Sequence, residues 1–298
     1  MRILITGGTG LIGRQLCALL LAGQHEVSVL SRTPRMVPAR CGAKVRAMAS
    51  LTEWTPEVAF DAIVNLAGAP IVAARWSERR KHLLRDSRIA LTEALVNAIG
   101  KARHKPAVLL SGSATGYYGD GGDTPMTETS GHGADFGAGL CLDWERMALR
   151  AQGYGVRVVL LRTGLVLHPS GGLLGRMLLP FKLGLGAQLG DGRQWMSWIH
   201  MRDYLALMLR LLDQSGATGA FNMTAPEPVT NAEFTATMAR VLQRPTLIKA
   251  PAALLRLGLG EMSELLIGGQ RVLPTKAQAI GYRFSFPKLE DALRDLLR

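Results

Sequence analysis

The stretch that decides the fold is MRILITGGTGLIG, residues 1–13. An apolar run of strand length leads into glycines, and apolar residues at helical spacing follow. A Gly-x-x-Gly-x-x-Gly pattern in this setting is typical of a loop that binds a dinucleotide pyrophosphate. Gly7 can take backbone angles closed to other residues, Gly10 leaves room for the pyrophosphate, and Gly13 lets the helix pack close to its strand. The free N–H groups at the start of that helix then face the diphosphate. A glycine-rich turn without a ligand is the alternative, but the flanking strand and helix favour dinucleotide binding.

The composition is that of a globular protein with a sizeable core. A length of 298 residues, 48% of them hydrophobic, fits one large α/β domain plus a smaller lobe. Cys17, Cys41 and Cys141 are far apart and lack metal-ligand spacing, which is typical of reduced thiols in a cytosolic protein. No apolar run reaches membrane-spanning length, and the start of the chain lacks the charge pattern of a signal peptide. These features predict a cytoplasmic protein without a bound metal or a membrane partner.

The net charge of +12 indicates an anionic ligand rather than a nucleic acid. Nucleic-acid binding favours a dense basic patch interleaved with aromatic side chains. Here the basic residues are dispersed and aromatic residues make up only 6% of the chain. We therefore interpret the charge as a solvated basic surface that also attracts an anionic cofactor or small-molecule substrate. Nucleic-acid binding is the less favoured alternative.

The end of the second predicted strand, Glu26–Leu30, discriminates between NAD and NADP. In a dinucleotide-binding fold this strand end meets the adenosine ribose, where a carboxylate would bind the ribose hydroxyls and repel a 2′-phosphate. This chain has Ser31 and Arg32 there, followed by Thr33 and Arg35. An arginine stays charged and suits bidentate contact with a phosphate. The sequence therefore predicts NADP(H) rather than NAD(H); an exposed loop arginine is the alternative, but it does not explain the missing acid.

Strand and helix patterns alternate along the first part of the chain. Such alternation predicts an α/β fold with a doubly wound parallel Rossmann sheet and right-handed crossovers. Further segments are assigned from their periodicity and flanking residues. We predict strands at Lys44–Met48, Phe60–Gly68, Val108–Leu110 and Val156–Leu161, a polar lead-in at Trp76–Arg88, helices at Ser87–Ile99, Leu140–Ala151, Asp203–Leu212 and Thr230–Leu242 (capped by Thr230 or Asn231), and a long loop at Gly119–Gly139.

The regular alternation of predicted strands and helices ends near Gly171, and glycines and prolines interrupt the segments that follow. We predict an NADP-binding Rossmann domain over residues 1–168, to which about 195–225 also belong. A smaller, mostly helical substrate-side lobe is expected over 169–194 and 226–298.

Taken together, Thr6–Gly13, Asn65–Gly68 and Ser113–Tyr117 resemble the extended short-chain dehydrogenase/reductase superfamily, which includes the nucleotide-sugar epimerases. More narrowly, the chain is similar to the atypical subgroup called "epimerase family", whose substrates are unknown. This similarity covers nearly the whole chain, and the subgroup's C-terminal extension maps onto roughly 250–298. The further motifs that carry it are Arg75-Trp76, Ser87-Arg88, Trp144-Glu145, Arg162-Thr163-Gly164, Gly171-Gly172, Leu179-Pro180-Phe181, Gly184-Leu185-Gly186, Trp198-Ile199-His200, Asp203, Asn222, Ala225-Pro226 and Gly268–Pro274.

The resemblance implies a set of cofactor contacts and a place for the reactive end. In the active superfamily a Tyr, and a Lys four residues later, lie on the helix after the long loop, while a Ser on the fifth strand orients the substrate. Ser113 matches that serine, but the window Phe136–Arg146 holds neither Tyr nor Lys. The implied cofactor contacts are Gly7, Thr9, Gly10, Leu11, Ile12, Gly13, Ser31, Arg32, Leu66, Ala67, Gly68, Arg88 and Val166.

Several side chains could replace the missing pair, and each also has a structural interpretation. Tyr117 and Tyr118 lie at the strand end beside the predicted nicotinamide, or they simply pack there. Cys141 on a helix is more often a small buried apolar residue than a nucleophile. The remaining candidates are Asp143, Glu145, His200 and Asp203. Structurally, Trp144-Glu145 would lock their helix to the sheet. His200 and Asp203 would order the loop that enters their helix, with Asp203 as a cap near its start. We expect Ser113 to line the reactive end, with Tyr117 as the candidate acid–base group.

Two functions remain open from the sequence. The first is an NADP(H)-dependent oxidoreductase or epimerase with an unconventional proton donor. The second is an NADP(H)-binding sensor or scaffold without catalysis, which the missing Tyr and Lys would explain.

Overall fold

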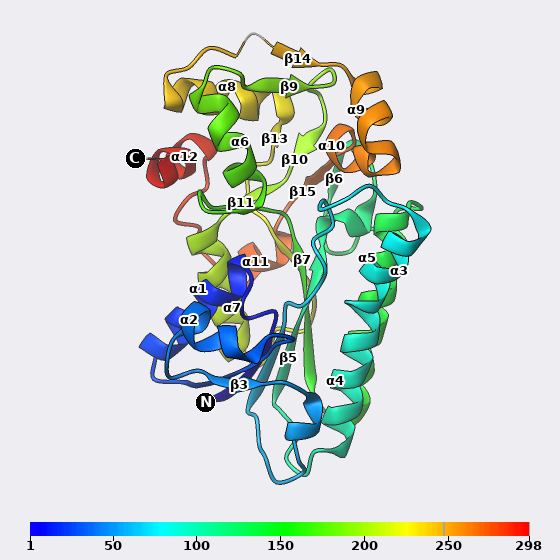
Figure 1. Cartoon of the computed structure of the whole chain (residues 1–298), viewed down its shortest axis with the longest axis vertical. Helices are drawn as coiled ribbons and strands as arrows, with labels where there is room; N and C mark the ends of the chain where they lie inside the picture. The colour runs from blue at the N-terminus through cyan, green and yellow to red at the C-terminus, as the bar shows by residue number, and fades with distance from the viewer. Residues whose placement is uncertain (247, 298) are drawn as a thin grey trace.

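The computed structural model describes residues 1–246 and 248–297 and contains one large central sheet (Figure 1). Its seven strands lie in the order β12-β7-β5-β4-β1-β2-β3, and every neighbouring pair is parallel. The strand order reverses between β1 and β4, and such a reversal is where open α/β sheets bind their ligands. The doubly wound parallel fold predicted from the sequence is confirmed. The strands are β1 (Arg2–Thr6), β2 (Glu26–Leu30), β3 (Arg46–Met48), β4 (Ala62–Asn65), β5 (Val108–Ala114), β7 (Arg157–Thr163) and β12 (Gly219–Met223).

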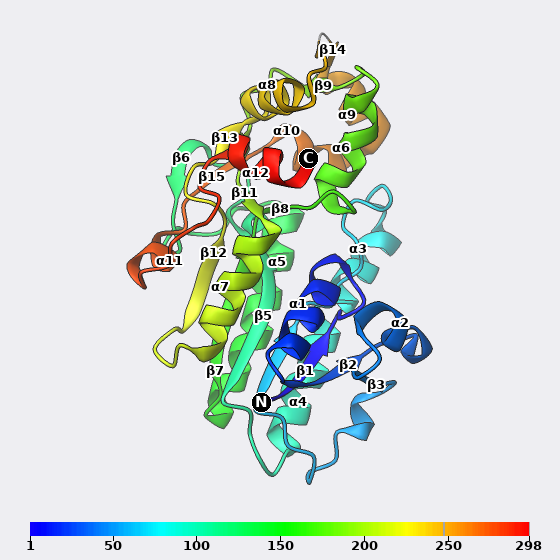
Figure 2. The ribbon, with the colours of Figure 1, turned by 90° about the vertical axis from the view of Figure 1, so that its left-hand side faces the viewer.

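Helices cover both faces of this sheet, because its strands carry apolar side chains on both sides. In β1, Ile3 and Ile5 pack on one face, and Leu4 packs on the opposite face. Figure 2 shows α1 and α7 on one side of the strands and α4 and α5 on the other. The covering helices are α1 (Leu11–Ala22), α2 (Val37–Cys41) and α7 (Met201–Asp213) on the first face, and α4 (Ile89–Lys101) and α5 (Phe136–Leu149) on the second.

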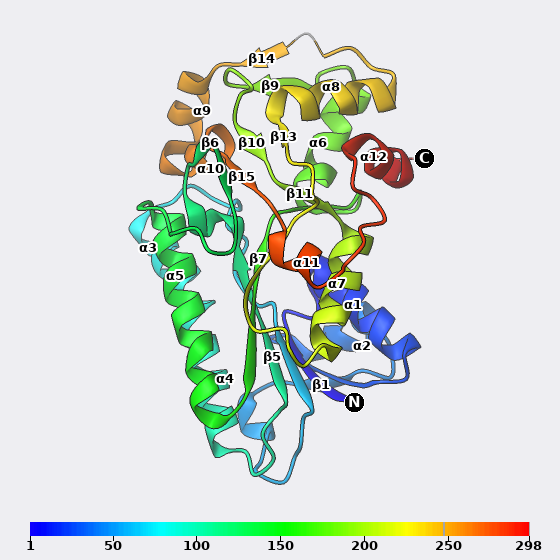
Figure 3. The same ribbon diagram turned by 180° about the vertical axis from the view of Figure 1, so that it is seen from behind.

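A smaller lobe lies beyond the carboxyl ends of the strands and has its own apolar core, which includes Trp198 and Phe234 (Figure 3). It mixes helices with short two-stranded pairings such as β9–β14 and β15–β6. Its elements, with those that link it to the sheet, are α3 (Glu78–Asp86), β6 (Gly122–Met126), β8 (Leu165–Leu167), α6 (Gly172–Lys182), β9 (Ala187–Leu189), β10 (Trp195–Met196), β11 (Trp198–His200), β13 (Val229–Thr230), α8 (Asn231–Leu242), β14 (Ile248–Ala250), α9 (Ala252–Leu259), α10 (Glu264–Ile267), β15 (Gln270–Val272), α11 (Thr275–Ala279) and α12 (Leu289–Leu297). Short 3₁₀ turns complete the chain at Pro34–Met36, Leu51–Glu53, Thr115–Tyr118, Arg150–Tyr154 and Gly260–Ser263.

One helix in the first half was not predicted, and one loop assignment was wrong. The polar lead-in at Trp76–Arg88 contains helix α3, which the Ser77 hydroxyl caps by accepting a hydrogen bond from the Arg80 N–H. This helix buries only Leu84, so it shows little apolar periodicity. The loop predicted at Gly119–Gly139 contains β6, whose exposed residues pair with β15 from far along the chain.

One helix start differs from its prediction, and another agrees with it. Helix α5 begins at Phe136, four residues before the predicted start, because the Asp135 carboxylate caps it through the Ala138 N–H at 2.9 Å. Helix α8 begins at Asn231 behind the Thr230 cap, as predicted.

Within the described residues, no helix is both long and apolar enough to cross a membrane.

Candidate functional site

The loop between β1 and α1 takes the shape that the glycine pattern predicts. Gly7 has a φ of +71°, and a side chain there would lie 2.7 Å from the Leu66 backbone of the neighbouring strand end. A Cβ at Gly13 would lie 2.4 Å from the Gly7 carbonyl oxygen. Gly13 therefore brings the helix close to the glycine loop itself, not to the strand as predicted. Both glycines are required by close approach of backbone to backbone.

The start of α1 leaves backbone N–H groups for a ligand. Gly10 occupies the N-cap position without a side chain, and the first turn has no acidic residue. The N–H groups of Leu11, Ile12 and Gly13 consequently have no side-chain cap, and the positive end of the helix dipole points with them. Such a helix start binds phosphate groups.

A pocket of about 340 Å³ lies at the end of β2, where the adenosine ribose was predicted to bind. Its lining includes Ser31, Arg32 and Thr33, together with Thr9 of the glycine loop, and no carboxylate lines it. The sequence analysis missed Arg40, which α2 brings into the same lining, while Arg35 does not line it. Two guanidinium groups and three hydroxyl groups in one pocket suit a phosphate monoester.

Exchanging Arg32 for Asp is expected to shift cofactor preference from NADPH toward NADH. One charge-assisted bidentate contact contributes about 1.5–3 kcal/mol, so NADPH affinity should fall about ten- to a hundredfold. Fluorescence titration of both cofactors measures the ratio of the two dissociation constants. Arg35→Asp is the matched control, since it makes the same charge change outside the pocket lining. An unchanged ratio in Arg32→Asp would remove this arginine from the assignment.

The end of β4 is held against β1 by a buried polar cluster. The Thr6 hydroxyl donates to the Asn65 side-chain oxygen at 2.7 Å and accepts from the Ala67 N–H at 3.2 Å. A Cβ at Gly68 would lie 2.9 Å from the Arg88 guanidinium carbon. These contacts fix Leu66–Gly68 beside the glycine loop, as expected for a backbone segment that lies against a cofactor.

Arg88 braces this segment from behind. Its guanidinium donates to the Ala69 carbonyl at 3.1 Å and to the Leu84 carbonyl at 3.2 Å, and it lies 5.3 Å from the Trp144 ring centroid. Burial lowers the pKa of Arg88. The side chain thus holds the end of β4 in place, and direct contact with the cofactor stays a prediction.

Val166 in β8 lies near the start of α1 through the loop that follows it. A Cβ at Gly172 would lie 3.3 Å from the Val166 carbonyl oxygen and 3.5 Å from the Leu11 side chain. The Arg14 guanidinium also donates to the Ser170 hydroxyl at 2.6 Å. The structure therefore brings Val166 and the glycine loop into one region.

Ser113, the predicted reactive-end serine, belongs to a buried ionic network. Its hydroxyl donates to Glu145 Oε1 at 2.6 Å. The Glu145 carboxylate accepts two hydrogen bonds of 2.9 Å from Arg162, one from Nε and one from Nη2. The Glu145 and Arg162 side chains are each only 6% exposed, so this pair is almost fully desolvated. In the superfamily that the sequence resembles, the corresponding serine faces the substrate, whereas here its proton is directed at Glu145.

Two tyrosines surround the other side of Arg162. Arg162 Nη1 donates to the Tyr118 hydroxyl at 3.0 Å, and that hydroxyl donates to Asn222 Oδ1 at 2.7 Å. The Tyr117 ring lies face-on over the guanidinium, 3.5 Å from its carbon, and Tyr117 remains half-buried. Desolvation raises the pKa of the buried Tyr118. Tyr117 is therefore the more exposed of the two tyrosines.

The face of α5 next to β5 carries Gly137, Cys141 and Glu145, spaced four residues apart. Desolvation raises the pKa of the Cys141 thiol to about 12, which disfavours the thiolate that a nucleophile requires. Trp144 donates to the Thr92 hydroxyl at 3.0 Å and locks α5 to α4. The structural interpretations of Cys141 and Trp144 therefore hold. Asp143 pairs with Arg85 of α3 at 2.6 Å, away from this face.

His200 and Asp203 hold the end of the chain. His200 itself caps α7, because its Nδ1 accepts from the Arg202 N–H at 3.0 Å, and the predicted capping role of Asp203 was wrong. The fully buried Asp203 carboxylate accepts from the Ser285 and Phe286 N–H groups at 2.8 Å each. These residues are structural in this chain.

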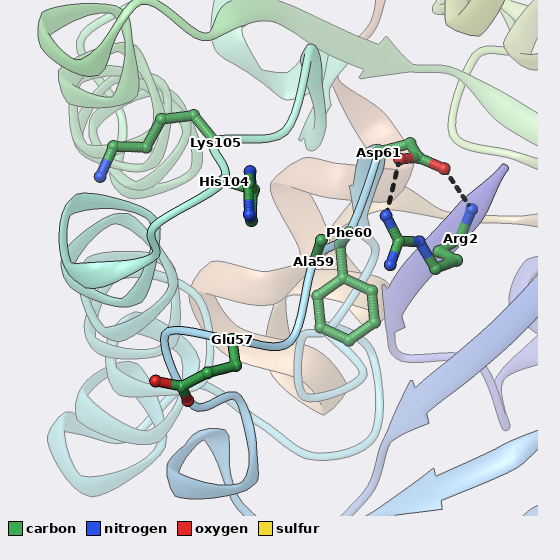
Figure 4. A pocket seen from close by; sticks show the side chains of 7 residues that line it. All are labelled: Arg2, Glu57, Ala59, Phe60, Asp61, His104 and Lys105. Atoms are coloured by element: carbon green, nitrogen blue, oxygen red, sulfur yellow. Dashed lines mark hydrogen bonds and ion pairs between the residues drawn. The ribbon is translucent and has the colours of Figure 1, made fainter.

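A second pocket, of about 290 Å³, lies at the amino ends of β1 and β4. Figure 4 shows the Arg2–Asp61 contact beside His104 and Lys105 in its wall. It shares no lining residue with the predicted site and lies at the edge opposite the carboxyl ends of the strands. Since ligands of open α/β sheets bind at the carboxyl edge, we assign no function to it.

Comparison with known proteins agrees with this geometry. Residues 3–224 match the model of the NAD dependent epimerase/dehydratase family, and residues 250–296 match a domain of unknown function, DUF1731. The second match coincides with the C-terminal extension predicted from the sequence.

Relatives cover nearly the whole chain. The epimerase family protein Mb2239 of Mycobacterium bovis is 41% identical over 98% of this chain and 96% of its own length. The chloroplastic SDR39U1 homolog of Arabidopsis thaliana is 38% identical over 100% of this chain and 87% of its own length. The crystal structure of human epimerase family protein SDR39U1 with NADPH has a TM-score of 0.91 and 36% identity, covering 99% of each chain. The prediction of NADP(H) from Ser31 and Arg32 agrees with the ligand of that human protein.

Proposed function

This chain belongs to the NAD dependent epimerase/dehydratase family, and we propose that it is an NADP(H)-dependent oxidoreductase or epimerase that acts on a small-molecule alcohol or carbonyl. The observation that carries the proposal is the half-buried Tyr117 ring, which stacks over the buried guanidinium of Arg162 at the carboxyl ends of β5 and β7.

The cofactor half of the proposal rests on the glycine loop and the β2 pocket. The N–H groups at the start of α1 would hold the pyrophosphate, and Leu66–Gly68 would lie along the cofactor backbone. Arg32 and Arg40 would contact the 2′-phosphate. The NADPH found in the human relative supports this arrangement for the present chain.

At the reactive end, the nicotinamide of NADP(H) would supply a hydride to a carbonyl. Tyr117 would give its proton to the alkoxide that results and would regain a proton from solvent, because the side chain is only half-buried. The same steps in reverse would oxidise an alcohol. Arg162 would stabilise negative charge next to the phenol, since the guanidinium stays protonated. Glu145 and Ser113 would act as positioning residues that hold Arg162 under the Tyr117 ring.

Tyr117→Phe is expected to lower kcat at least tenfold while leaving NADPH affinity unchanged, since loss of general acid catalysis typically costs about 10²–10⁴ in rate. The measurement is NADPH oxidation with panels of aldehydes, ketones and nucleotide sugars, beside fluorescence titration of NADPH. Tyr154→Phe is the control, because that exposed phenol lies over Lys105, at the opposite edge of the sheet. Full activity of Tyr117→Phe on a turned-over substrate would exclude this tyrosine as the proton donor.

A second candidate function is an NADP(H)-binding sensor or scaffold without turnover. The observation that favours it is the face of α5, where Gly137 and Cys141 offer no acid–base group and Glu145 engages the Ser113 hydroxyl. NADPH binding with no oxidation across the same panels would support this function instead.

A further inference from the structure

One surface of the small lobe exposes more apolar side chains than any other described part of the molecule. It is built from residues 172–190, 243–246 and 248–259, and we call it the distal face. The large hydrophobic side chains of the described residues that are more than half exposed all lie on it, led by Leu257 at 76%. Scattered single exposed leucines need no explanation, but a contiguous group marks an interaction surface. The exposed apolar residues of the distal face are Leu179, Leu183, Leu185, Ile248, Leu254 and Leu257.

The two segments form one surface because they pair directly. Strand β9 pairs with β14, and the Gly190 N–H donates to the Ala250 carbonyl at 2.8 Å. The Arg244 Nε donates to the Lys182 carbonyl at 2.9 Å. Figure 2 shows α6, β9, β14 and α9 together at one end of the molecule.

Helix α9 is the most unusual part of the distal face. Its sequence is AALLRLGL, yet none of its residues is buried. A helix that is apolar nearly all round is normally covered by protein or by lipid. Ala252, Leu255 and Leu259 are half-buried, and the rest of the helix, including Leu254 and Leu257, is exposed.

The charged side chains within the two segments of the distal face are all cations, and the exposed Asp191 follows the first segment directly. Segments 172–190 and 243–259 contain no Asp or Glu, and they carry five cations: Arg176, Lys182, Arg244, Lys249 and Arg256. A carboxylate from outside these segments reaches one of them, since Glu264 lies 3.4 Å from Arg256. The surface therefore combines exposed aliphatic side chains with lysines and arginines.

We propose that the distal face docks the protein onto the surface of a lipid bilayer that contains anionic lipids. Leucines on a protruding helix and a neighbouring loop would enter the headgroup boundary, while the lysines and arginines would face the lipid phosphates. The net charge of +12 favours the same approach to an anionic surface. The sequence analysis expected no membrane partner because no apolar run is long enough to span a bilayer. Docking on the surface of a bilayer does not require such a run. The docking is independent of the proposed enzymatic function.

Charge and composition favour a bilayer over the other occupants. A second copy would bring the same cations against each other in a two-fold interface, which is repulsive. An acidic protein partner would match the charge, but protein interfaces favour aromatic anchors, and the one aromatic residue in these segments, Phe181, is only 2% exposed. Leucine and lysine without aromatic side chains suit the adaptable surface of a bilayer.

The test is co-sedimentation of the full-length protein with vesicles of phosphatidylcholine alone, or with one part phosphatidylglycerol to two parts phosphatidylcholine. The wild type should bind the anionic vesicles and release with rising salt. Leu254→Ser/Leu257→Ser should weaken binding about tenfold or more through lost apolar burial. Lys182→Gln/Lys249→Gln should weaken it about thirtyfold, since each cation contributes about fivefold.

Leu19→Ser/Lys101→Gln is the matched control, because both residues are exposed and lie far from the distal face. Leu183→Ser/Leu185→Ser serves as a second apolar variant in case the α9 variant unfolds, which circular dichroism detects. Absence of binding to anionic vesicles, or binding unchanged in both apolar variants, overturns the proposal. So does a dimer, seen by light scattering, that Leu254→Ser/Leu257→Ser dissociates, because the leucines would then be covered by a second copy.

Discussion

Replacing Arg162 by methionine is expected to lower the free energy of unfolding by about 3–5 kcal/mol. The substitution removes the Arg162 guanidinium, which donates two hydrogen bonds to Glu145, and leaves the buried Glu145 carboxylate without a cationic partner. It also removes the stacking partner of Tyr117 and a donor to Tyr118. Urea denaturation followed by tryptophan fluorescence measures the change.

The double variant Glu145→Gln/Arg162→Met should be more stable than the single one, since no charge is left buried without a partner. Arg150→Met is the control for an exposed pair. Its guanidinium lies 3.4 Å from Glu93 with both side chains about half exposed, so the cost should stay within about 1 kcal/mol. If Arg162→Met lowered the free energy of unfolding no more than Arg150→Met does, the prediction would be wrong: Arg162 would then stabilise the buried Glu145 carboxylate no more than Arg150 stabilises the exposed Glu93.

Gly13→Ala is expected to weaken NADPH binding by about a hundredfold. The new Cβ would lie 2.4 Å from the Gly7 carbonyl oxygen and 2.6 Å from the Gly8 Cα, and both of these are backbone atoms that cannot turn aside. The loop must move, and the N–H groups at the start of α1 lose their alignment. Two charge-assisted hydrogen bonds lost at about 1.5 kcal/mol each correspond to that factor.

Gly139→Ala is the matched control, because it also adds a methyl group near the start of a helix, but nothing lies within 4 Å of the new atom. Calorimetric titration of NADPH compares the variants, and denaturation curves separate lost binding from lost folding. NADPH affinity of Gly13→Ala close to that of Gly139→Ala would show that the glycine loop does not hold the cofactor.

Much of the fold could be predicted because the signals are local. The strand–glycine–helix stretch at the start of the chain fixes the first unit of the sheet, and apolar runs mark β4 and β7. The Arg32 position follows from its distance along the chain to the end of β2. By contrast, α3 is polar on most sides, and β6 finds its partner β15 about 150 residues away, so neither has a pattern in its own segment.

The candidate site could be predicted only in part, because several of its contacts join residues that are far apart in the sequence. Ser113 could be located by its match to a motif, but its partner Glu145 depends on the packing of α5 against β5. Tyr118 and Asn222 meet across 104 residues of sequence, which no periodicity reveals. Arg40 lines the ribose pocket because α2 brings it there, and nothing in its spacing from β2 along the sequence shows this.

The hydrogen bonds that residues 282–286 donate to Asp203 have a consequence for folding during synthesis. The carboxylate at the start of α7 receives its two backbone donors from Ser285 and Phe286, and Tyr282 adds its hydroxyl at 3.2 Å. Residues 285 and 286 must therefore be synthesised before α7, which lies about 80 residues earlier in the sequence, can gain these two hydrogen bonds. A chain truncated before residue 285 would lack both backbone donors to the buried Asp203 carboxylate, so its folded state is expected to be less stable.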